Sequence, residues 1–154
     1  MSSELRNRIN TELKEGMHAK NEIKTATIRL IIAAIKDRDI SARTKGDGCG
    51  ITDDEILSLF QTMMKQRTES MKMYHDGGRD ELAAREANEI KIIESFLPAQ
   101  FSDEEIGDAV QQAMDETGAT GVKDMGRVMA FLKDNYAGQM DFGKASQIVK
   151  SRLI

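Results

Sequence analysis

A single proline, Pro98, is present in this chain of 154 residues. Average usage would place roughly eight prolines in a chain of this length. Because proline lacks a backbone N–H and breaks helices, its near absence favours helical structure along most of the sequence. The apolar residues agree, since they recur at the three- and four-residue spacing of a helix face. We therefore expect an all-α fold.

Pro98 also separates the expected helices into two groups. Proline disfavours helical geometry at the residue before it, so a helix is expected to end there. Four long helices precede Pro98 and three shorter ones follow it. Their expected ranges are 5–17, 22–40, 52–76, 82–97, 102–117, 125–136 and 141–153. This division predicts an N-terminal four-helix domain at 1–97 and a C-terminal three-helix domain at 98–154.

Short polar motifs mark several helix ends. Thr52 and Glu55 have the spacing of a capping box, in which the two side chains satisfy each other's backbone amides. A serine at 102 and a glutamate at 105 repeat this spacing. Gly118 is expected to end a helix in the left-handed conformation. Asp141 is expected to cap the last helix.

The overall charge and the apolar runs exclude several classes of protein. A formal net charge of -4 and a pI near 5.3 argue against a protein that coats DNA or an anionic membrane by bulk electrostatics. The longest apolar run, 30–35, has six residues, whereas a membrane span needs about 18. The first residues lack the apolar core of a signal peptide. Since the lone Cys49 permits no internal disulfide, we expect a cytoplasmic protein.

Charge is nevertheless segregated along the chain. Residues 1–45 carry a net charge of +4 and residues 123–154 carry +3. Residues 46–97 carry -5 and residues 98–122 carry -6. An anionic partner is therefore expected to bind locally, at one of the two basic ends.

No residue pattern supports catalysis or a bound cofactor. His18 and His75 have no accompanying nucleophile, and Cys49 has no second cysteine or histidine near it in the sequence. The aperiodic segment 41–51 contains three glycines, but no Gly-Lys-Ser/Thr follows to bind phosphates. The spacing motifs of zinc and calcium sites are also missing from the sequence. We expect no catalytic residue, no cofactor and no metal.

The basic C-terminal segment offers candidate binding residues. Its six cations are interleaved with Phe131, Tyr136 and Phe142, and single-stranded RNA commonly stacks on aromatic rings placed among cations. Ordinary solvated helix faces are the alternative, because Tyr136 and Phe142 also fall on expected apolar stripes. Contacts to three or four phosphates would give a salt slope of about 2–3. The candidate RNA-binding residues are Lys123, Arg127, Lys133, Lys144, Lys150 and Arg152.

The ten methionines indicate a different kind of partner. Met64, Met71 and Met73 lie on the expected third helix but do not share one face. Methionines on the apolar stripes are expected to fill the core, because the flexible thioether adapts to irregular gaps. The others leave apolar surface for a second protein chain or for the C-terminal domain.

Four segments, in order between residues 13 and 154, have a familiar pattern. They are LKEGMHAKNEIKTATIRLIIAAIKDRDI at 13–40, LPAQFSDEEI at 97–106, ETGATGVKDMGRVMAFLK at 116–133 and GKASQIVKSRLI at 143–154. Together they resemble the YqeY family, also called GatB/YqeY-like proteins. The resemblance implies a helical N-terminal domain followed by a small three-helix tail.

The tail of that family is similar to the C-terminal part of the B subunit of the bacterial aspartyl/glutamyl-tRNA amidotransferase, which touches tRNA. The resemblance therefore implies tRNA, or a component of amidation or translation, as the partner. Lys123 and Lys144 match the tail pattern with phosphate-binding chemistry, and Arg127 lies beside them. This chain departs from the pattern at Ala130, where the family usually has glycine, and at 135–140, which has no lysine. The matching positions are Gly118, Lys123, Asp124, Gly126, Val128, Met129, Gly143, Lys144 and Val149.

Three functions remain open at the level of sequence. The first is a non-catalytic helical module associated with tRNA, with translation or with tRNA-dependent amidation. The second, implied by the resemblance, is an accessory part of a carbon–nitrogen ligase that uses glutamine as the amide donor. No residue pattern supports that activity in this chain alone. The third is a protein–protein interaction scaffold.

Overall fold

The computed structural model describes residues 3–46, 48 and 50–154. Within these ranges it contains seven α-helices, one short 3-10 helix and no strand. This result confirms the expected all-α class. The elements are α1 (Glu4–His18), α2 (Glu22–Thr44), α3 (Asp53–Asp76), α4 (Asp80–Glu94), α5 (Asp103–Thr117), η1 (Val122–Asp124), α6 (Met125–Tyr136) and α7 (Phe142–Leu153).

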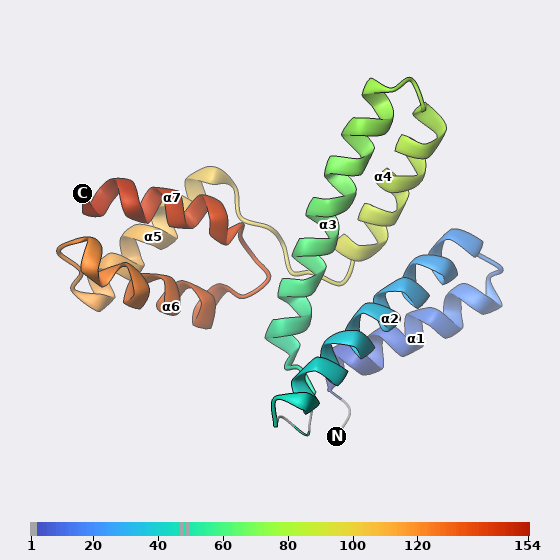
Figure 1. Cartoon of the computed structure of the whole chain (residues 1–154), viewed down its shortest axis with the longest axis horizontal. Coiled ribbons are helices and arrows are strands. Elements are labelled where there is room, and N and C mark those ends of the chain that lie inside the picture. Colours follow the sequence, from blue (N-terminus) through green and yellow to red (C-terminus); the bar gives the residue numbers. More distant parts are fainter. Residues whose placement is uncertain (1–2, 47, 49) are drawn as a thin grey trace. The chain divides into compact units, whose positions relative to one another are not determined.

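The helices belong to two compact units, Met1–Leu97 and Pro98–Ile154, which we call the first unit and the second unit. In the first unit, α1 pairs with α2 and α3 pairs with α4, so that two helical hairpins form (Figure 1). Helix α2 contacts α1, α3 and α4 and therefore joins the two hairpins. Its central position agrees with the dense apolar residues in its sequence.

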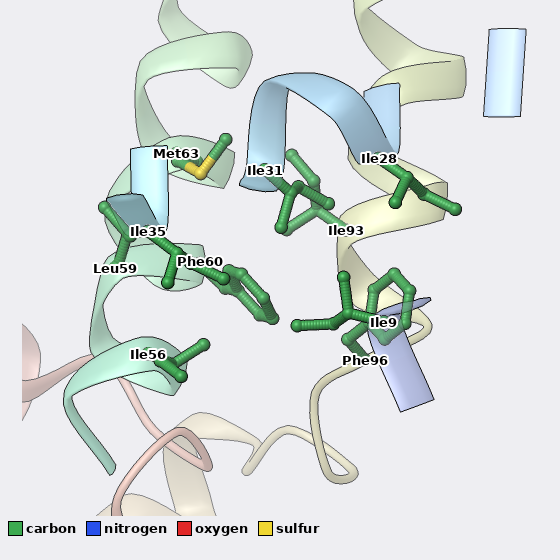
Figure 2. Close-up of a cluster of buried hydrophobic side chains, with 10 residues drawn as sticks. All are labelled: Ile9, Ile28, Ile31, Ile35, Ile56, Leu59, Phe60, Met63, Ile93 and Phe96. Carbon is green, nitrogen blue, oxygen red and sulfur yellow. The ribbon is translucent and has the colours of Figure 1, made fainter. Parts of the chain in front are cut away.

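The core of the first unit contains ten buried side chains from all four helices and from the turn after α4 (Figure 2). The rings of Phe60 and Phe96 contribute to it with their centroids 6.0 Å apart. One side of α2 stays open, because Ile23, Leu30 and Ile40 are each about half exposed. The core residues are Ile9, Ile28, Ile31, Ile35, Ile56, Leu59, Phe60, Met63, Ile93 and Phe96.

The second unit has its own core, and each of α5, α6 and α7 contacts the other two. The buried positions recur at helical spacing on all three helices, as the sequence predicts. Phe101, which precedes α5, lies against Tyr136 of α6 with ring centroids 5.2 Å apart. The core residues are Ile106, Ala109, Val110, Ala113, Val128, Leu132, Met140, Ala145, Val149 and Leu153.

The two predicted capping motifs start α3 and α5. Thr52 Oγ1 accepts a hydrogen bond from Glu55 N at 3.2 Å, and Glu55 Oε2 accepts one from Thr52 N at 3.3 Å, which completes a capping box. Ser102 Oγ accepts from Glu105 N at 3.2 Å, but here the serine hydroxyl donates to Glu105 Oε1. Each serine or threonine oxygen thus satisfies an amide that the helix itself leaves unpaired.

Other helix ends are formed by single residues. Ser3 Oγ accepts from Arg6 N at 3.1 Å at the start of α1. Asp141 Oδ1 accepts from Gly143 N at 2.8 Å and caps α7, as predicted. Gly118 ends α5 with a φ of 64°, the left-handed conformation expected from the sequence.

Two helix ends differ from the prediction by three or more residues. Helix α2 continues to Thr44 rather than ending at Ile40, so it includes the first residues of the expected loop. Helix α4 ends at Glu94, and residues 95–97 form a turn that places Phe96 in the core. Across the described ranges, no helix is both long enough and apolar enough to cross a membrane.

Candidate nucleic-acid interface

A buried carboxylate organises the turn that carries two of the predicted cations. Asp124 Oδ2 accepts hydrogen bonds from Thr120 N at 3.0 Å and from Gly121 N at 3.3 Å. Asp124 Oδ1 accepts from Arg127 Nη2. The Thr120 amide first, and then the Arg127 guanidinium, lower the pKa of Asp124 to about 2. The carboxylate therefore fixes the connection between α5 and α6, in which Lys123 lies exposed.

Asp124 is a positioning residue to which the sequence assigned no role. The sequence signal that could have revealed its contact with Arg127 is the spacing of three residues, because side chains three apart are neighbours on a helix. The arginine keeps 61% of its side chain exposed while it is paired. Lys123 in η1 and Arg127 in the first turn of α6 thus lie on either side of Asp124 in the sequence, and the hydrogen bonds of its carboxylate fix the geometry of this turn.

Three of the six predicted cations have no acidic partner among the residues that the structure describes. These are Lys123 in η1, Lys133 in the last turn of α6 and Lys150 in the last turn of α7. All three are exposed. Their charge is therefore available to an anionic ligand. A lysine in the last turn of a helix also interacts favourably with the negative end of the helix dipole.

Two other predicted cations contact α5. Lys144 Nζ lies 3.2 Å from Asp103 Oδ1, and both side chains are more than half exposed. Such a pair contributes at most about 1 kcal/mol, so Lys144 can exchange this partner for another anion. Arg152 Nη1 donates to the Gly107 carbonyl at 3.0 Å and also lies 3.4 Å from Gln111 Oε1. Arg152 therefore fastens α7 to α5.

The predicted cations do not share one face of the second unit. At 100° per residue, Arg127 and Lys133 lie 120° apart around α6. Lys144 and Lys150 are separated by the same angle around α7. Helical geometry therefore places Lys133 on a different face of α6 from Arg127, and it places Lys150 on a different face of α7 from Lys144. Any phosphate contacts are therefore spread around this unit.

The interleaved aromatic rings are part of the core. Phe131, Tyr136 and Phe142 are partly buried, and all three pack against the buried residues of the second unit. Tyr136 Oη also donates to Gln112 Oε1 at 3.0 Å. The alternative expectation for Tyr136 and Phe142, that they belong to the apolar stripes, is confirmed. This interface offers cations rather than a platform for base stacking.

Comparison with known proteins decides the family. The family model described as Yqey-like protein matches residues 6–153. The chain belongs to the YqeY-like family. The resemblance expected from the four sequence segments is thereby confirmed.

Several relatives of this YqeY-like protein carry the name "Altered inheritance of mitochondria protein 41, mitochondrial". The relative from Clavispora lusitaniae is 31% identical over 148 residues, which cover 94% of this chain and 82% of the relative. The relative from Vanderwaltozyma polyspora is 28% identical over 151 residues, with coverage of 93% and 76%. The relative from Candida glabrata is 33% identical over 87 residues, with coverage of 56% and 46%.

The names of these relatives contradict the predicted cytoplasmic location, which was wrong. They are named as mitochondrial proteins. The prediction depended partly on the lone Cys49, and a single cysteine excludes an internal disulfide without specifying any one compartment. Cys49 itself lies outside the described residues.

Within the described residues of this YqeY-like protein, the histidines and acidic residues form no recognisable reactive centre. In the described part of the chain, no group of three or more His, Cys, Asp or Glu side chains is placed to hold a metal ion. His18 is the exposed last residue of α1. His75 Nδ1 lies 3.2 Å from Asp80 Oδ1, and both side chains are mostly exposed.

Proposed function

We propose that this YqeY-like protein is a non-catalytic helical module that binds tRNA, or a tRNA-containing component of translation or amidation, through a separate domain at 98–154. One observation carries the proposal. Lys123, Lys133 and Lys150 are exposed and have no acidic partner within the described residues. This holds although residues 98–122 contain six acidic residues and no Lys or Arg. The local acidic charge therefore leaves these three cations free for a ligand.

The paired cations support the same role to different degrees. Lys144 and Arg127 are held by single carboxylates while most of each side chain stays exposed, so a phosphate can compete for them. Arg152 is excluded from the binding set, because it fastens α7 to α5 through the Gly107 carbonyl. We therefore draw the contact from Lys123, Arg127, Lys133, Lys144 and Lys150, three or four of which meet phosphates at one time.

The test is tRNA binding by a triple variant, Lys123→Glu, Lys133→Glu and Lys150→Glu, across a series of salt concentrations. If these three lysines contact phosphates, the wild type binds with a log–log salt slope of about 2–3 and the variant binds at least about tenfold more weakly. All three side chains are exposed, so the variant is expected to keep its helical circular dichroism spectrum.

A matched control separates local contacts from total charge. Lys65, Lys72 and Lys91 are exposed residues of the first unit, and their change to glutamate alters the net charge by the same amount. The control variant is expected to bind tRNA within about threefold of the wild type, because the proposed contact belongs to the second unit alone. Equal loss in both triple variants, or no binding by the wild type at low salt, contradicts the proposal.

The accessory role in amidation needs a separate assay. The chain is added to a glutamine-dependent amidotransferase whose own B-subunit tail has been removed, and amide transfer to mischarged tRNA is measured. Restored transfer by the wild type, but not by the triple variant, places the tRNA contact in amidation. Binding of tRNA without any restored transfer limits the role to tRNA association.

A second candidate function, a protein–protein interaction scaffold, is favoured by an apolar hollow between α3 and α4. Its volume is about 510 Å³, and Met71 and three alanines form much of its surface. Met64 packs against the first core, whereas Met73 is 74% exposed outside the hollow. The lining residues are Thr68, Met71, Lys72, His75, Ala83, Ala84 and Ala87.

A capture experiment from lysate, with and without RNase, distinguishes the two functions. Proteins retained after RNase treatment, and lost from a Met71→Glu and Ala84→Glu double variant, support the scaffold. A Met73→Glu variant is the control, because this exposed residue does not line the hollow. Complete loss of captured proteins after RNase treatment contradicts the scaffold and favours RNA as the primary partner.

A further inference from the structure

A second cationic feature lies in the first unit, in the groove between α1 and α2. The groove contains a hollow of about 370 Å³, within the size range of small-molecule sites. Residues of α2 at positions 32, 35, 36, 39 and 43 follow helical spacing, so they form one stripe along the groove. The complete lining is Arg6, Ile9 and Asn10 from α1 with Ile32, Ile35, Lys36, Asp39 and Arg43 from α2.

The only acidic residue of this lining is already engaged by protein donors. Asp39 Oδ1 accepts from Arg6 Nη2 at 2.9 Å and from Ile51 N at 2.9 Å. Asp39 Oδ2 accepts from Arg6 Nη1 at 2.9 Å. The charges of Arg6 and Asp39 therefore cancel each other. The Asp39 carboxylate has few free lone pairs left with which to bind the remaining cations.

Lys36 and Arg43 supply the charge that remains in the hollow. Both are exposed, and neither forms an ion pair with an acidic residue in the described part of the chain. Arg43 lies near enough to Asp39 to lower the pKa of that carboxyl, but it does so after the Arg6 hydrogen bond and the Ile51 amide. With the Arg6–Asp39 pair neutral, the lining keeps a formal charge of +2.

The floor of the hollow is apolar. Ile9 and Ile35 are buried core residues, and Ile32 packs against the same core while it lines the hollow. Asn10 adds an amide at the α1 side. A ligand that fits this arrangement carries a compact double negative charge on one end and an apolar or planar body on the other.

We propose that the α1–α2 hollow binds a small phosphate monoester whose body is apolar or planar. A phosphate monoester carries a charge of about -1.5 to -2 near neutral pH, which matches the two cations. An arginine fork and a lysine ammonium are the common donors to phosphate oxygens. The body of the ligand covers the isoleucine floor and removes apolar area from water. This site is separate from the tail cations and does not depend on the proposed tRNA contact.

The experiment uses adenosine monophosphate as the probe, with the full chain and ¹³C-labelled isoleucine methyl groups. We expect methyl signals of Ile9, Ile32 and Ile35 to shift on titration. Inorganic phosphate and adenosine are each expected to bind at least about tenfold more weakly than the monophosphate, because each makes only part of the contacts. Absence of binding at millimolar concentration, or shifts confined to other isoleucines, contradicts the proposal.

Charge variants test which residues hold the phosphate. A Lys36→Gln and Arg43→Gln double variant is expected to bind the probe at least about tenfold more weakly. A Lys20→Gln and Arg38→Gln variant loses the same charge outside the lining and is expected to bind within about twofold of the wild type. Equal weakening by both variants overturns the assignment.

Substitutions at Asn10 supply a test that removes no existing cation. Asn10 is exposed, so its replacement is expected to leave the fold unchanged. Asn10→Lys is expected to tighten binding of the monophosphate, and Asn10→Asp is expected to weaken it. No change in either variant contradicts the location of the phosphate in this hollow. The tail variant Lys123→Glu, Lys133→Glu and Lys150→Glu is expected to bind the probe like the wild type, so the two proposals fail independently.

Discussion

Arg6 and Asp39, 33 residues apart in the sequence, form a bidentate ion pair in which two guanidinium nitrogens each lie 2.9 Å from a carboxylate oxygen. Arg6 Nη2 also donates to the Ile51 carbonyl at 3.0 Å, and the Ile51 amide donates to Asp39 Oδ1. One ion pair therefore joins the start of α1, the end of α2 and the segment that leads into α3. Both side chains are largely buried, at 23% and 14% exposure.

Removal of the Asp39 charge is expected to destabilise the first unit. Asp39→Asn weakens two charge-assisted hydrogen bonds and leaves Arg6 without its counter-ion, at a cost of about 1.5–3 kcal/mol. Urea unfolding at pH 7, followed by far-ultraviolet circular dichroism, measures the change. A conservative Arg38→Gln variant serves as the control, since Arg38 lies on α2 and takes no part in the hydrogen bonds of this network. A change below about 0.5 kcal/mol in Asp39→Asn contradicts the role assigned to the pair.

The same pair predicts a pH dependence. The Arg6 hydrogen bonds lower the pKa of Asp39 below its ordinary value. The stabilisation is therefore fully present above the unfolded pKa of about 4 and is lost as the pH falls through the lowered folded pKa. We expect the difference in unfolding free energy between wild type and Asp39→Asn to shrink below about pH 4. A difference that is constant down to pH 2 contradicts this mechanism.

Gly50 is expected to be intolerant of a side chain. Its φ of 80° is left-handed, and an added Cβ would overlap the Asp39 carboxylate. Gly50→Ala is therefore expected to cost about 1–3 kcal/mol. Gly78 is the matched control, because its φ is 73° but a Cβ there would meet no atom within 4 Å. Equal destabilisation by Gly50→Ala and Gly78→Ala in urea unfolding would show that only the backbone conformation matters at Gly50.

Local signals in the sequence predicted much of the fold. The Thr52–Glu55 capping box, the Asp141 cap and the left-handed Gly118 each depend on residues a few positions apart, and all three are present in the structure. The helical class is confirmed for the same reason, because apolar spacing within one helix reports the face that it buries. Patterns within one helix do not determine how much of that helix's apolar face the neighbouring helices cover. Leu30 therefore remains about half exposed on the central helix α2.

The partners of charged residues are the part that the sequence did not reveal. Arg152 and Gly107 are 45 residues apart, and Arg6 and Asp39 are 33 apart, so no local pattern links them. The six tail cations consequently looked equivalent in the sequence. The structure separates Arg152, which joins two helices, from cations such as Lys123 that have no acidic partner among the described residues.

The ion pair between α3 and α4 is expected to be replaceable by apolar side chains. Arg67 Nε lies 3.1 Å from Glu89 Oε2, and the side chains are 16% and 11% exposed. Glu89→Leu alone leaves the buried Arg67 guanidinium without a counter-ion and is expected to cost about 3 kcal/mol, whereas Arg67→Met leaves Glu89 paired with the exposed Arg85 at 3.5 Å and is expected to cost less. The double variant is expected to lie within about 1 kcal/mol of the wild type, as measured by urea unfolding.

A more exposed pair provides the comparison for that double-mutant cycle. Lys24 Nζ and Glu12 Oε2 lie 2.6 Å apart, and their side chains are 27% and 30% exposed. Single changes at these two residues are expected to cost about 0.2–1 kcal/mol, because solvent screens the charges. If the Glu89→Leu single variant is as mild as these, burial of the α3–α4 pair does not control its energy.

Asp124 is expected to control the turn between α5 and α6 through its ionised form. Its folded pKa of about 2 lies below the ordinary value, so its stabilisation is present above about pH 4 and is lost as the pH falls through 2. In a nuclear magnetic resonance titration, the Thr120 amide signal is expected to shift with a midpoint near pH 2, because that amide donates to Asp124 Oδ2.

Asp124→Asn is expected to abolish this titration and to accelerate exchange of the Thr120 and Gly121 amide protons at pH 7. An Asp134→Asn variant, on the exposed surface of α6, is expected to preserve both signals. A Thr120 midpoint near pH 4 in the wild type would show that these hydrogen bonds do not favour the charged carboxylate.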